Sequence, residues 1–370
     1  MTEVLENLIG QPVEQADTPV PLLDLDAFER NGTYIAGFLN EHGLSWRPHV
    51  KAHKSPQLAR LQLKLGATGV TCAKLGEAEV MVAHGIGNVL IANHLSTPLK
   101  WARAAALQRQ AQVIVCVDDR DHVRMAAAAA ADAGVRIPLL IEVDIGMGRA
   151  GVPSTADALA VAGDIAASAG VWLAGVMGYE GHLLTTWPAA EKHARCAQAL
   201  AKLTDVAADL RAAGHEVGIV SSGGTGSFEF TADLPGLTEI QAGGGCLMDR
   251  FYAEDCHVGL EQALTVLTTV VSVQAAGRAV IDAGFKTCGY LKGFSLPQVL
   301  GRPGVAMLAL SAEHGILEVR NPDEPLQVGT RIQLVPGYSD AMLVLHDHLL
   351  GHRAGRVTEV IAMPARGRLT

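Results

Sequence analysis

Arg47-Pro48-His49-Val50-Lys51-Ala52-His53-Lys54 is the stretch that decides the fold prediction. It follows the short apolar run at residues 44–46 and precedes a helix-like segment that begins near Ser55 and Pro56. A strand that ends here and leads into a helix places Lys51 at the mouth of its sheet. A lysine in such a position can lose its proton and attack a carbonyl carbon, as Schiff-base lysines do. The alternative interpretation is a solvated basic patch on the protein surface.

The same change from apolar run to helix-like segment repeats through most of the chain before residue 245. Eight apolar runs are predicted strands: 47–51, 69–73, 88–93, 112–117, 138–144, 172–178, 216–223 and 237–244. Alanine-rich helical stretches separate these runs, which indicates a parallel sheet covered on both faces. Eight such units predict an α/β fold with a closed (β/α)8 barrel of the TIM type. The competitor is an open doubly wound sheet, but the chain lacks an early glycine-rich dinucleotide fingerprint.

The pattern changes after Asp249, where helix-like repeats stop and glycine, proline and asparagine turns join short apolar segments. The predicted strands there are 263–275, 277–283, 305–311, 315–319, 331–335 and 356–361. We therefore expect two domains, a barrel at residues 19–255 and a C-terminal all-β domain at residues 256–370, with residues 1–18 pairing with the latter.

Composition excludes several functional classes. The chain has 370 residues, 49% of them hydrophobic, and a net charge of −9 with a pI near 5.8. A nucleic-acid-binding protein would need a basic face, so we expect no nucleic-acid partner. The chain has neither a signal-peptide pattern at its N-terminus nor an apolar run long enough to span a membrane. Its six cysteines are scattered without metal-binding spacing, which indicates reduced thiols in a cytoplasmic protein.

Polar or glycine-rich segments follow several predicted strands, at the edge where barrel enzymes place their sites. Residues 221–227 and 241–246 are glycine-rich turns after the last two strands of the barrel. Glycine allows backbone N–H groups to approach an anion closely, so this neighbouring pair favours a phosphate site over two tight turns. A lysine across the mouth from a phosphate site suggests pyridoxal phosphate, whose aldehyde would meet Lys51 and whose phosphate would meet the glycines.

Three further side chains follow strand ends. Arg149 lies after Gly146-Met147-Gly148, while Tyr179 and His182 follow the sixth predicted strand. Each of these residues could be structural. An arginine at the mouth of a phosphate-cofactor site is better suited to binding the cofactor hydroxyl or a substrate carboxylate.

Four motifs together resemble a known family: Arg47–Lys54, Val143–Gly151, Gly223–Gly226 and Asp282–Lys286. They are similar to the D-threonine aldolase and eukaryotic-type D-serine dehydratase family, a branch of the alanine-racemase-like, fold type III pyridoxal phosphate enzymes. The likeness runs from about residue 18 to the C-terminus. It implies an N-terminal barrel, a C-terminal β-domain and a homodimer with sites at the subunit interface.

The resemblance also implies site residues. Lys51 would be the Schiff-base lysine for pyridoxal 5′-phosphate, with Arg149 and Tyr179 around the cofactor ring. Thr225 and the turn of Gly243, Gly244 and Gly245 would bind the phosphate. Their positions at strand ends add three candidates for cofactor binding: His49, Ser222 and Gly224.

The family's metal motif is altered here. The family has a histidine two residues before an aspartate or cysteine, whereas this chain has Tyr338 two residues before Asp340. A neutral phenol is a poor ligand for Mg²⁺ or Mn²⁺, so we expect these two residues to form a polar wall for the substrate side chain instead. His346 and His348 are an alternative source of metal ligands, on one face of an alternating strand.

The expected function is that of a lyase acting on a small amino acid. It would perform retro-aldol cleavage of a β-hydroxy-D-amino acid, with His182 taking the β-hydroxyl proton. An amino-acid racemase or epimerase, which needs no metal, and a D-3-hydroxy-amino-acid dehydratase remain open. A non-enzymatic pyridoxal phosphate carrier is disfavoured because such proteins are commonly single short barrels.

Overall fold

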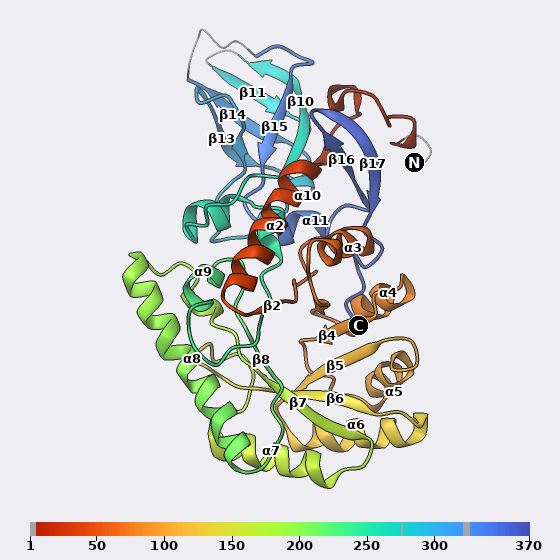
Figure 1. The fold of residues 1–370 in the computed structure, drawn as a ribbon. Helices are drawn as coiled ribbons and strands as arrows, with labels where there is room; N and C mark the ends of the chain where they lie inside the picture. The colour runs from red at the N-terminus through yellow and green to blue at the C-terminus, as the bar shows by residue number, and fades with distance from the viewer. Residues whose placement is uncertain (1–4, 275–276, 321–325) are drawn as a thin grey trace. The chain divides into compact units, whose positions relative to one another are not determined.

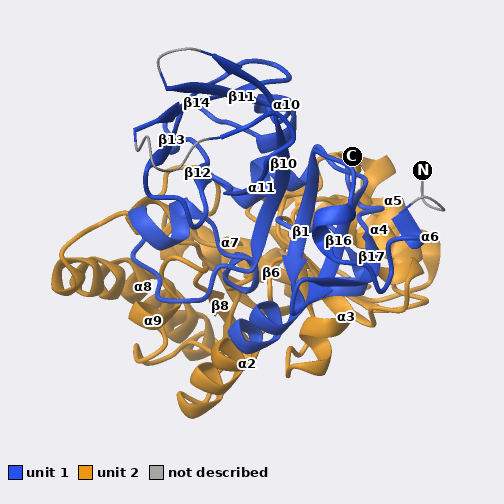
Figure 2. Cartoon of the chain, turned by 90° about the horizontal axis from the view of Figure 1, so that it is seen from above, with its two compact units in different colours: residues 1–32, 52–58, 244–366 blue, residues 33–51, 59–243, 367–370 orange. Residues whose placement is uncertain are grey.

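The computed structural model describes residues 5–274, 277–320 and 326–370. These residues form two compact units (Figure 2). The barrel unit comprises residues 33–51, 59–243 and 367–370, and the β-unit comprises residues 1–32, 52–58 and 244–366. Each unit is thus assembled from segments that are distant in sequence. The expected functional domains at 19–255 and 256–370 stay a prediction.

The barrel unit contains one sheet of eight parallel strands (Figure 1). They are β2 (Ser45–Trp46), β3 (Val70–Cys72), β4 (Asn88–Ile91), β5 (Gln112–Val117), β6 (Ile137–Glu142), β7 (Val171–Met177), β8 (Ile219–Ser222) and β9 (Glu239–Ile240). The strand order is β2-β9-β8-β7-β6-β5-β4-β3. Seven of these strands fall within or overlap their predicted runs, and β2 ends just before the first run begins.

The segment that follows β2 closes the ring. His49 forms a parallel bridge with Thr71 in β3, the strand at the other end of the strand order. The Val50 N–H donates to the Thr71 carbonyl at 2.8 Å, and the Thr71 N–H donates to the Pro48 carbonyl at 2.9 Å. The predicted closed barrel of the TIM type is confirmed, and the competing open sheet is wrong.

Helices cover the outside of this barrel. Those between the strands are α4 (Leu75–Ala83), α5 (Pro98–Leu107), α6 (Arg120–Ala133), α7 (Thr155–Ala167), α8 (Ala189–Ala212) and the short α9 (Phe228–Thr231). Figure 1 shows α5 to α8 lying outside the strands. Side-chain caps begin several of them, because Asp119 accepts from the Asp121 N–H and Ser154 accepts from the Asp157 N–H. The alanines facing inward are small enough to let α6 pack closely on the sheet.

The β-unit contains a second sheet of nine strands. They are β1 (Val20–Asp24), β10 (Leu264–Gln274), β11 (Arg278–Ile281), β12 (Gln298–Val299), β13 (Val305–Leu310), β14 (Gly315–Val319), β15 (Arg331–Val335), β16 (His348–Arg353) and β17 (Arg356–Ala362). Neighbours pair antiparallel, except that β1 pairs parallel with β16. Two short helices, α10 (Phe285–Cys288) and α11 (Ser339–Leu343), also lie in this mostly-strand unit.

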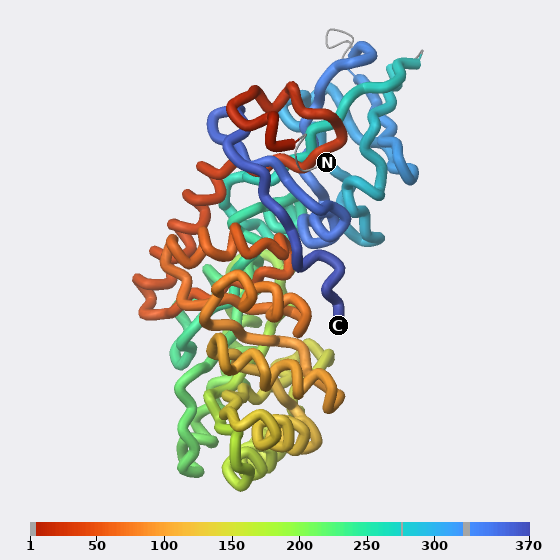
Figure 3. The backbone as a smooth tube through the Cα atoms, turned by 90° about the vertical axis from the view of Figure 1, so that its right-hand side faces the viewer, coloured from red at the N-terminus to blue at the C-terminus, as the bar shows by residue number. Residues whose placement is uncertain are grey.

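Residues near the N-terminus join the β-unit. Pro12 bridges Arg356, and the Gly10 N–H donates to the Val357 carbonyl at 2.8 Å. Figure 3 shows this N-terminal segment beside the β16–β17 hairpin. Val13 and Ala16 are buried against the sheet there, so they add to its apolar core.

Two further helices lie near the start of the chain. They are α2 (Leu25–Glu41) and α3 (Pro56–Lys64). α3 begins at the residue where the sequence predicted a helix after the Arg47–Lys54 stretch. In the described part of the chain, no helix is both long and apolar enough to cross a membrane. All six cysteines are buried thiols.

Candidate active site

The Arg47–Lys54 stretch is largely buried. The Arg47 side chain forms an ion pair with Glu239 at 2.9 Å, and both side chains are 5% exposed. Arg47 also donates to the Asn88 side chain at 2.7 Å, which joins β2, β9 and β4 inside the barrel. The alternative interpretation of this stretch as a solvated basic patch is therefore wrong.

His49 and Lys51 are half-buried just beyond that ion pair. The Lys51 N–H donates to His49 Nδ1 at 3.3 Å. Because Nδ1 accepts this hydrogen bond, the neutral imidazole carries its proton on Nε2 and can donate from there. The structure thus fixes which edge of the His49 ring is a donor.

Arg149 lies on a turn that only glycines can form. Asp144 accepts from the Gly146 and Gly148 N–H groups at 3.0 Å each, and these backbone hydrogen bonds lower the pKa of Asp144. The φ angles are +124° at Gly146 and +65° at Gly148, which other residues rarely adopt. The two glycines therefore let the chain fold back around Asp144 and present Arg149.

Arg149 and Tyr179, both predicted from sequence, are brought together. The Arg149 guanidinium carbon lies 5.7 Å from the centre of the Tyr179 ring, within range of a cation–π contact. Arg149 Nη2 also lies 3.6 Å from Oε1 of Glu142, the buried last residue of β6. The Arg149 guanidinium therefore lies close to both Tyr179 and Glu142, while 54% of the Arg149 side chain remains exposed.

The turn after β8 is organised by Glu180, a residue that the sequence analysis missed. This buried carboxylate accepts from Ser222 Oγ at 2.9 Å, Ser227 Oγ at 2.5 Å and the Gly223 N–H at 3.4 Å. A Cβ atom on Gly224 would lie 3.0 Å from the Tyr179 ring, so the turn and the ring touch. The only signal in the sequence was that Glu180 directly follows Tyr179.

The two glycine turns carry buried N–H groups that suit an anion. Hydrogen bonds among the described residues provide no acceptor for the N–H of Gly226 after β8 or of Gly243 after β9. Both residues are buried, and a buried donor without an acceptor is costly unless a ligand supplies one. Thr225, predicted as a phosphate ligand, is buried in the first of these turns. The residues present therefore fit a phosphate group.

The second turn divides between the two units. Gly243 belongs to the barrel unit and packs against the backbone of His49. Gly244 and Gly245 belong to the β-unit, within a short 3₁₀ turn. There, a Cβ atom on Gly244 would lie 2.7 Å from the Tyr252 ring. The roles of Gly244 and Gly245 in phosphate binding stay a prediction.

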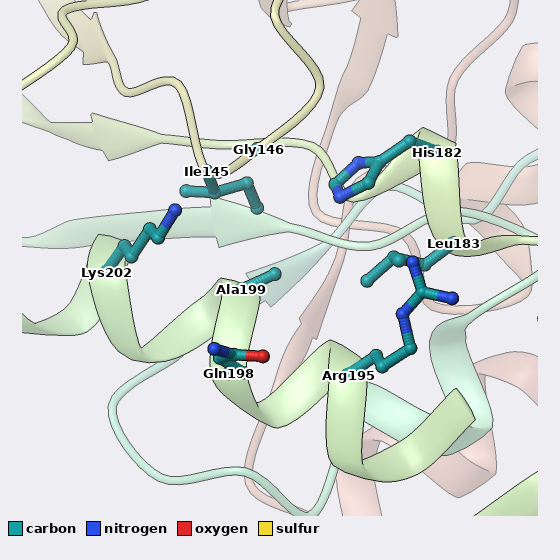
Figure 4. Close-up of a pocket in the computed structure, with 8 residues that line it drawn as sticks. All are labelled: Ile145, Gly146, His182, Leu183, Arg195, Gln198, Ala199 and Lys202. Carbon is teal, nitrogen blue, oxygen red and sulfur yellow. The ribbon is translucent and has the colours of Figure 1, made fainter. Parts of the chain in front are cut away.

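His182 lies in a single 3₁₀ turn after β7. Its Nε2 would be 3.1 Å from a Cβ atom on Gly146, so the imidazole lies over the turn that carries Arg149. The ring lines a pocket of about 180 Å³, drawn in Figure 4. The pocket residues are Ile145, Gly146, His182, Leu183, Arg195, Gln198, Ala199 and Lys202. The barrel unit therefore places the predicted base against the turn that carries the predicted arginine.

A cluster at the ends of β4, β5 and β6 was not predicted from sequence. It consists of His94, Asp118, His122 and Glu142, here called the histidine–carboxylate cluster. His94 Nε2 lies 3.1 Å from Glu142 Oε2 and its Nδ1 lies 3.7 Å from Asp118 Oδ2, while His122 Nδ1 lies 3.2 Å from Asp118 Oδ1. The available signal was that His94 and Asp118 follow strands at the catalytic edge of a barrel, with His122 four residues beyond Asp118 in α6.

Interactions within the cluster shift the pKa values of His94 and Asp118. Burial lowers the pKa of His94, but Glu142 and Asp118 outweigh it, so that the pKa is raised above its usual value. Partial burial opposes ionisation of Asp118, yet hydrogen bonds from His122 and the Gly151 N–H, together with His94, lower its pKa to about 2. Asp118 is therefore charged at neutral pH.

Tyr338 and Asp340 lie together in the β-unit. The Tyr338 hydroxyl donates to Asp340 Oδ2 at 3.0 Å. The Tyr338 ring stacks on Phe294, with ring centres 4.7 Å apart and planes inclined by 19°. Phe251 meets the same ring edge-on at 5.4 Å. Aromatic packing therefore holds the phenol beside the carboxylate.

These residues do not fit the divalent-metal site that the family resemblance implies. The phenol is packed between aromatic rings and uses its proton in the bond to Asp340. His346 Nε2 is 2.8 Å from the Thr287 carbonyl, to which it donates, and burial lowers its pKa. Over the described ranges, no group of three or more His, Cys, Asp or Glu side chains could hold a metal ion.

Comparisons with known proteins agree with the family resemblance found in the sequence. Residues 23–250 match the family described as "Alanine racemase, N-terminal domain", and residues 263–352 match a serine dehydratase domain. The chain is 37% identical to a D-threonine aldolase of Arthrobacter sp., over 97% of this chain and 95% of that protein. It is 35% identical to a 3-hydroxy-D-aspartate aldolase of Paracoccus denitrificans, over 98% and 95%. The crystal structure of the D-threonine aldolase from Filomicrobium marinum superposes with a TM-score of 0.94 at 36% identity, covering 98% of this chain and 99% of that one.

Proposed function

This chain belongs to the D-threonine aldolase-like branch of the alanine racemase N-terminal domain family, and we propose that it cleaves the Cα–Cβ bond of β-hydroxy-D-amino acids. The products would be an amino acid, glycine in the simplest case, and an aldehyde. The sequence similarity to two aldolases over nearly the whole chain supports a pyridoxal-phosphate-dependent lyase.

One contact carries the proposal at the level of geometry. β2 and β9 are neighbours in the barrel, and the backbone of Gly243 after β9 packs on the backbone of His49 after β2. Lys51 lies two residues beyond His49. The lysine and the buried Gly243 N–H, which has no acceptor among the described residues, therefore follow adjacent strands of one barrel, an arrangement that suits an aldehyde phosphate.

We assign cofactor binding to residues of both turns and to the lysine. Lys51 would hold the aldehyde carbon, and the turn with Ser222, Gly224 and Thr225 would bind the phosphate together with Gly243. When bound, pyridoxal phosphate supplies an electron-withdrawing ring that stabilises negative charge on the substrate Cα. Arg149 and Tyr179, with the donor edge of His49, would orient that ring.

The remaining steps fall to side chains of the chain itself. His182 would take the proton from the substrate β-hydroxyl, so that the oxygen forms a carbonyl as the Cα–Cβ bond breaks. The bond's electron pair stays on Cα, which is then protonated. Arg149 would bind a carboxylate or ring oxygen as a charge-assisted donor. Tyr338 and Asp340 would contact the substrate side chain without a metal ion.

Dehydration is the second candidate. The match of residues 263–352 to a serine dehydratase domain favours it, because the same substrate class can lose its β-hydroxyl as water. We further propose a homodimer, as the family resemblance implies, and a cytoplasmic location, which the six buried thiols support.

One assay separates these reactions. The purified protein is incubated with D-threonine, D-phenylserine and each enantiomer of alanine, and aldehyde, keto acid and optical rotation are followed in parallel. Aldehyde and glycine from D-threonine support the lyase. Keto acid without aldehyde would identify a dehydratase, and inversion of alanine alone would identify a racemase.

A further inference from the structure

Glu142 is shared by two cations at the end of β6. Its Oε2 lies 3.1 Å from His94 Nε2, and its Oε1 lies 3.6 Å from Arg149 Nη2. The Glu142 side chain is only 6% exposed, so water can offset little of its charge. A buried carboxylate needs compensation from neighbouring charges. The strength of the attraction between Glu142 and Arg149 therefore depends on the charge of His94.

Other members of the histidine–carboxylate cluster hold His94 in place. The rings of His94 and His122 stack, with centres 5.2 Å apart and planes inclined by 14°. Asp118 lies between their Nδ1 atoms and carries a negative charge. The same carboxylate accepts from the Gly151 N–H at 2.9 Å, which ties the cluster to the base of the Arg149 turn.

We propose that His94 is a positioning residue that sets, through Glu142, how strongly Arg149 can bind an anionic oxygen of the ligand. This inference rests on the proposed function in one respect, that Arg149 binds cofactor or substrate. When His94 is protonated, it compensates Glu142 and leaves the guanidinium available. When His94 is neutral, Arg149 is the remaining cation beside Glu142 and is drawn toward it.

The charges around His94 favour its protonated form. The groups that face it are Glu142 at the end of β6, Asp118 directly after β5, His122 from α6 and Arg149 from the turn after β6. Two anions and one permanent cation leave the cluster one positive charge short of neutrality. That imbalance favours one protonated imidazole, in agreement with the raised pKa of His94.

The test measures binding rather than turnover. Pyridoxine 5′-phosphate has the ring hydroxyl and phosphate but no aldehyde, so it cannot react with Lys51. Its dissociation constant is measured by quenching of tryptophan fluorescence at about pH 6 and about pH 8.5, on either side of an ordinary histidine pKa. The variant is His94→Gln, whose neutral amide can still donate to Glu142. His193→Gln is the matched control, because His193 pairs with Asp233 at 3.2 Å on the exposed surface of the same unit.

We expect the affinity of the unmodified protein to fall with rising pH by about 3- to 10-fold more than that of His94→Gln, as for a shift of half to one pKa unit. The ionisation of the ligand itself cancels in this ratio. His193→Gln should behave like the unmodified protein. Equal pH dependence in His94→Gln and the unmodified protein would overturn the inference. Borohydride trapping of pyridoxal phosphate on Lys51 in both proteins tests the proposed function separately, because it succeeds or fails whatever His94 does.

Discussion

The backbone of Gly243 packs directly on the backbone of His49. A Cβ atom added to Gly243 would lie 2.7 Å from the His49 nitrogen and closer still to its carbonyl oxygen. Neither neighbour is a side-chain end that could rotate away. This contact joins the turn after β9 to the segment that carries Lys51, so both the fold and the proposed cofactor site depend on it.

Replacing that glycine should therefore be costly. We expect Gly243→Ala to lower the free energy of unfolding by about 2–3 kcal/mol, because two backbones must separate, and to weaken pyridoxal phosphate binding. Gly163→Ala is the control, since Gly163 lies in α7 with no atom within 4 Å of an added Cβ. There, alanine should add about 0.5–1 kcal/mol. Urea unfolding of both variants measures these opposite changes in the free energy of unfolding. A Gly243→Ala protein as stable as the unmodified one would contradict the packing.

The lysine assignment can be tested chemically. Borohydride treatment of the protein loaded with pyridoxal phosphate should leave the pyridoxyl group on Lys51, as peptide mapping by mass spectrometry would detect. Lys51→Ala should lose both the adduct and turnover while circular dichroism stays unchanged, because the side chain is half-buried and not part of the core. Lys64→Ala, at the exposed end of α3, should retain both. An adduct on Lys54 or Lys74 would refute the assignment.

Arg149 should contribute to ligand binding. Arg149→Ala is expected to weaken binding of cofactor or substrate by about 1.5–3 kcal/mol, the range for a hydrogen bond to a charged group. Equilibrium titration with pyridoxine 5′-phosphate and the Michaelis constant for D-threonine measure the two cases separately. Arg120→Ala removes an arginine from an exposed pair with Asp164 on the same unit and should change neither. If both constants are unchanged in Arg149→Ala, the guanidinium is only structural.

Acid should selectively remove the contribution of Asp118. Its pKa is held at about 2, below the unfolded value near 3.9, so its stabilisation is present above pH 4 and is lost as the pH falls toward 2. Asp118→Asn should therefore cost about 1–2 kcal/mol at neutral pH, and the difference from the unmodified protein should shrink in acid. Urea unfolding at several pH values measures this trend. Asp164→Asn, in an exposed pair with Arg120, should change the free energy of unfolding little at any of these pH values.

The metal response should differ from that of a metal-dependent aldolase. With Tyr338 packed between aromatic rings and bonded to Asp340, activity should survive EDTA. Tyr338→His should create a response to Mn²⁺, because imidazole and carboxylate can then bind the ion together. Activity assays with EDTA, then with added Mn²⁺, compare the two proteins. Loss of activity in EDTA with recovery in Mn²⁺ for the unmodified protein would refute this prediction, and His346 and His348 would be the first ligands to test.

The barrel was predictable because its strands are buried on both faces and therefore appear as continuous apolar runs. β16 was missed for the opposite reason. It begins at His348 and contains Gly351 and Arg353, so it lacks a continuous apolar run. The first strand of the β-unit, β1, was missed because its partners, β10 and β16, are distant in sequence.

Candidate site residues were identifiable from the sequence where a residue type carries its own chemistry, as Lys51, Arg149 and the glycine turns do. Residues that act through a neighbour were not. Glu180 matters because three donors from the turn after β8 converge on it, and no local pattern announces that convergence. The same holds for His94, whose partners come from three other parts of the barrel.

The bridge between His49 and Thr71 links closure of the barrel to the position of Lys51. That bridge closes the ring of strands, and His49 lies two residues before Lys51. A chain whose ring is still open lacks the backbone contacts that hold His49, and through it Lys51, next to Gly243. Lys51, the proposed Schiff-base lysine, is therefore held next to Gly243 only in a completed barrel. Pyridoxal phosphate bound at the proposed site would in turn stabilise the completed barrel by mass action.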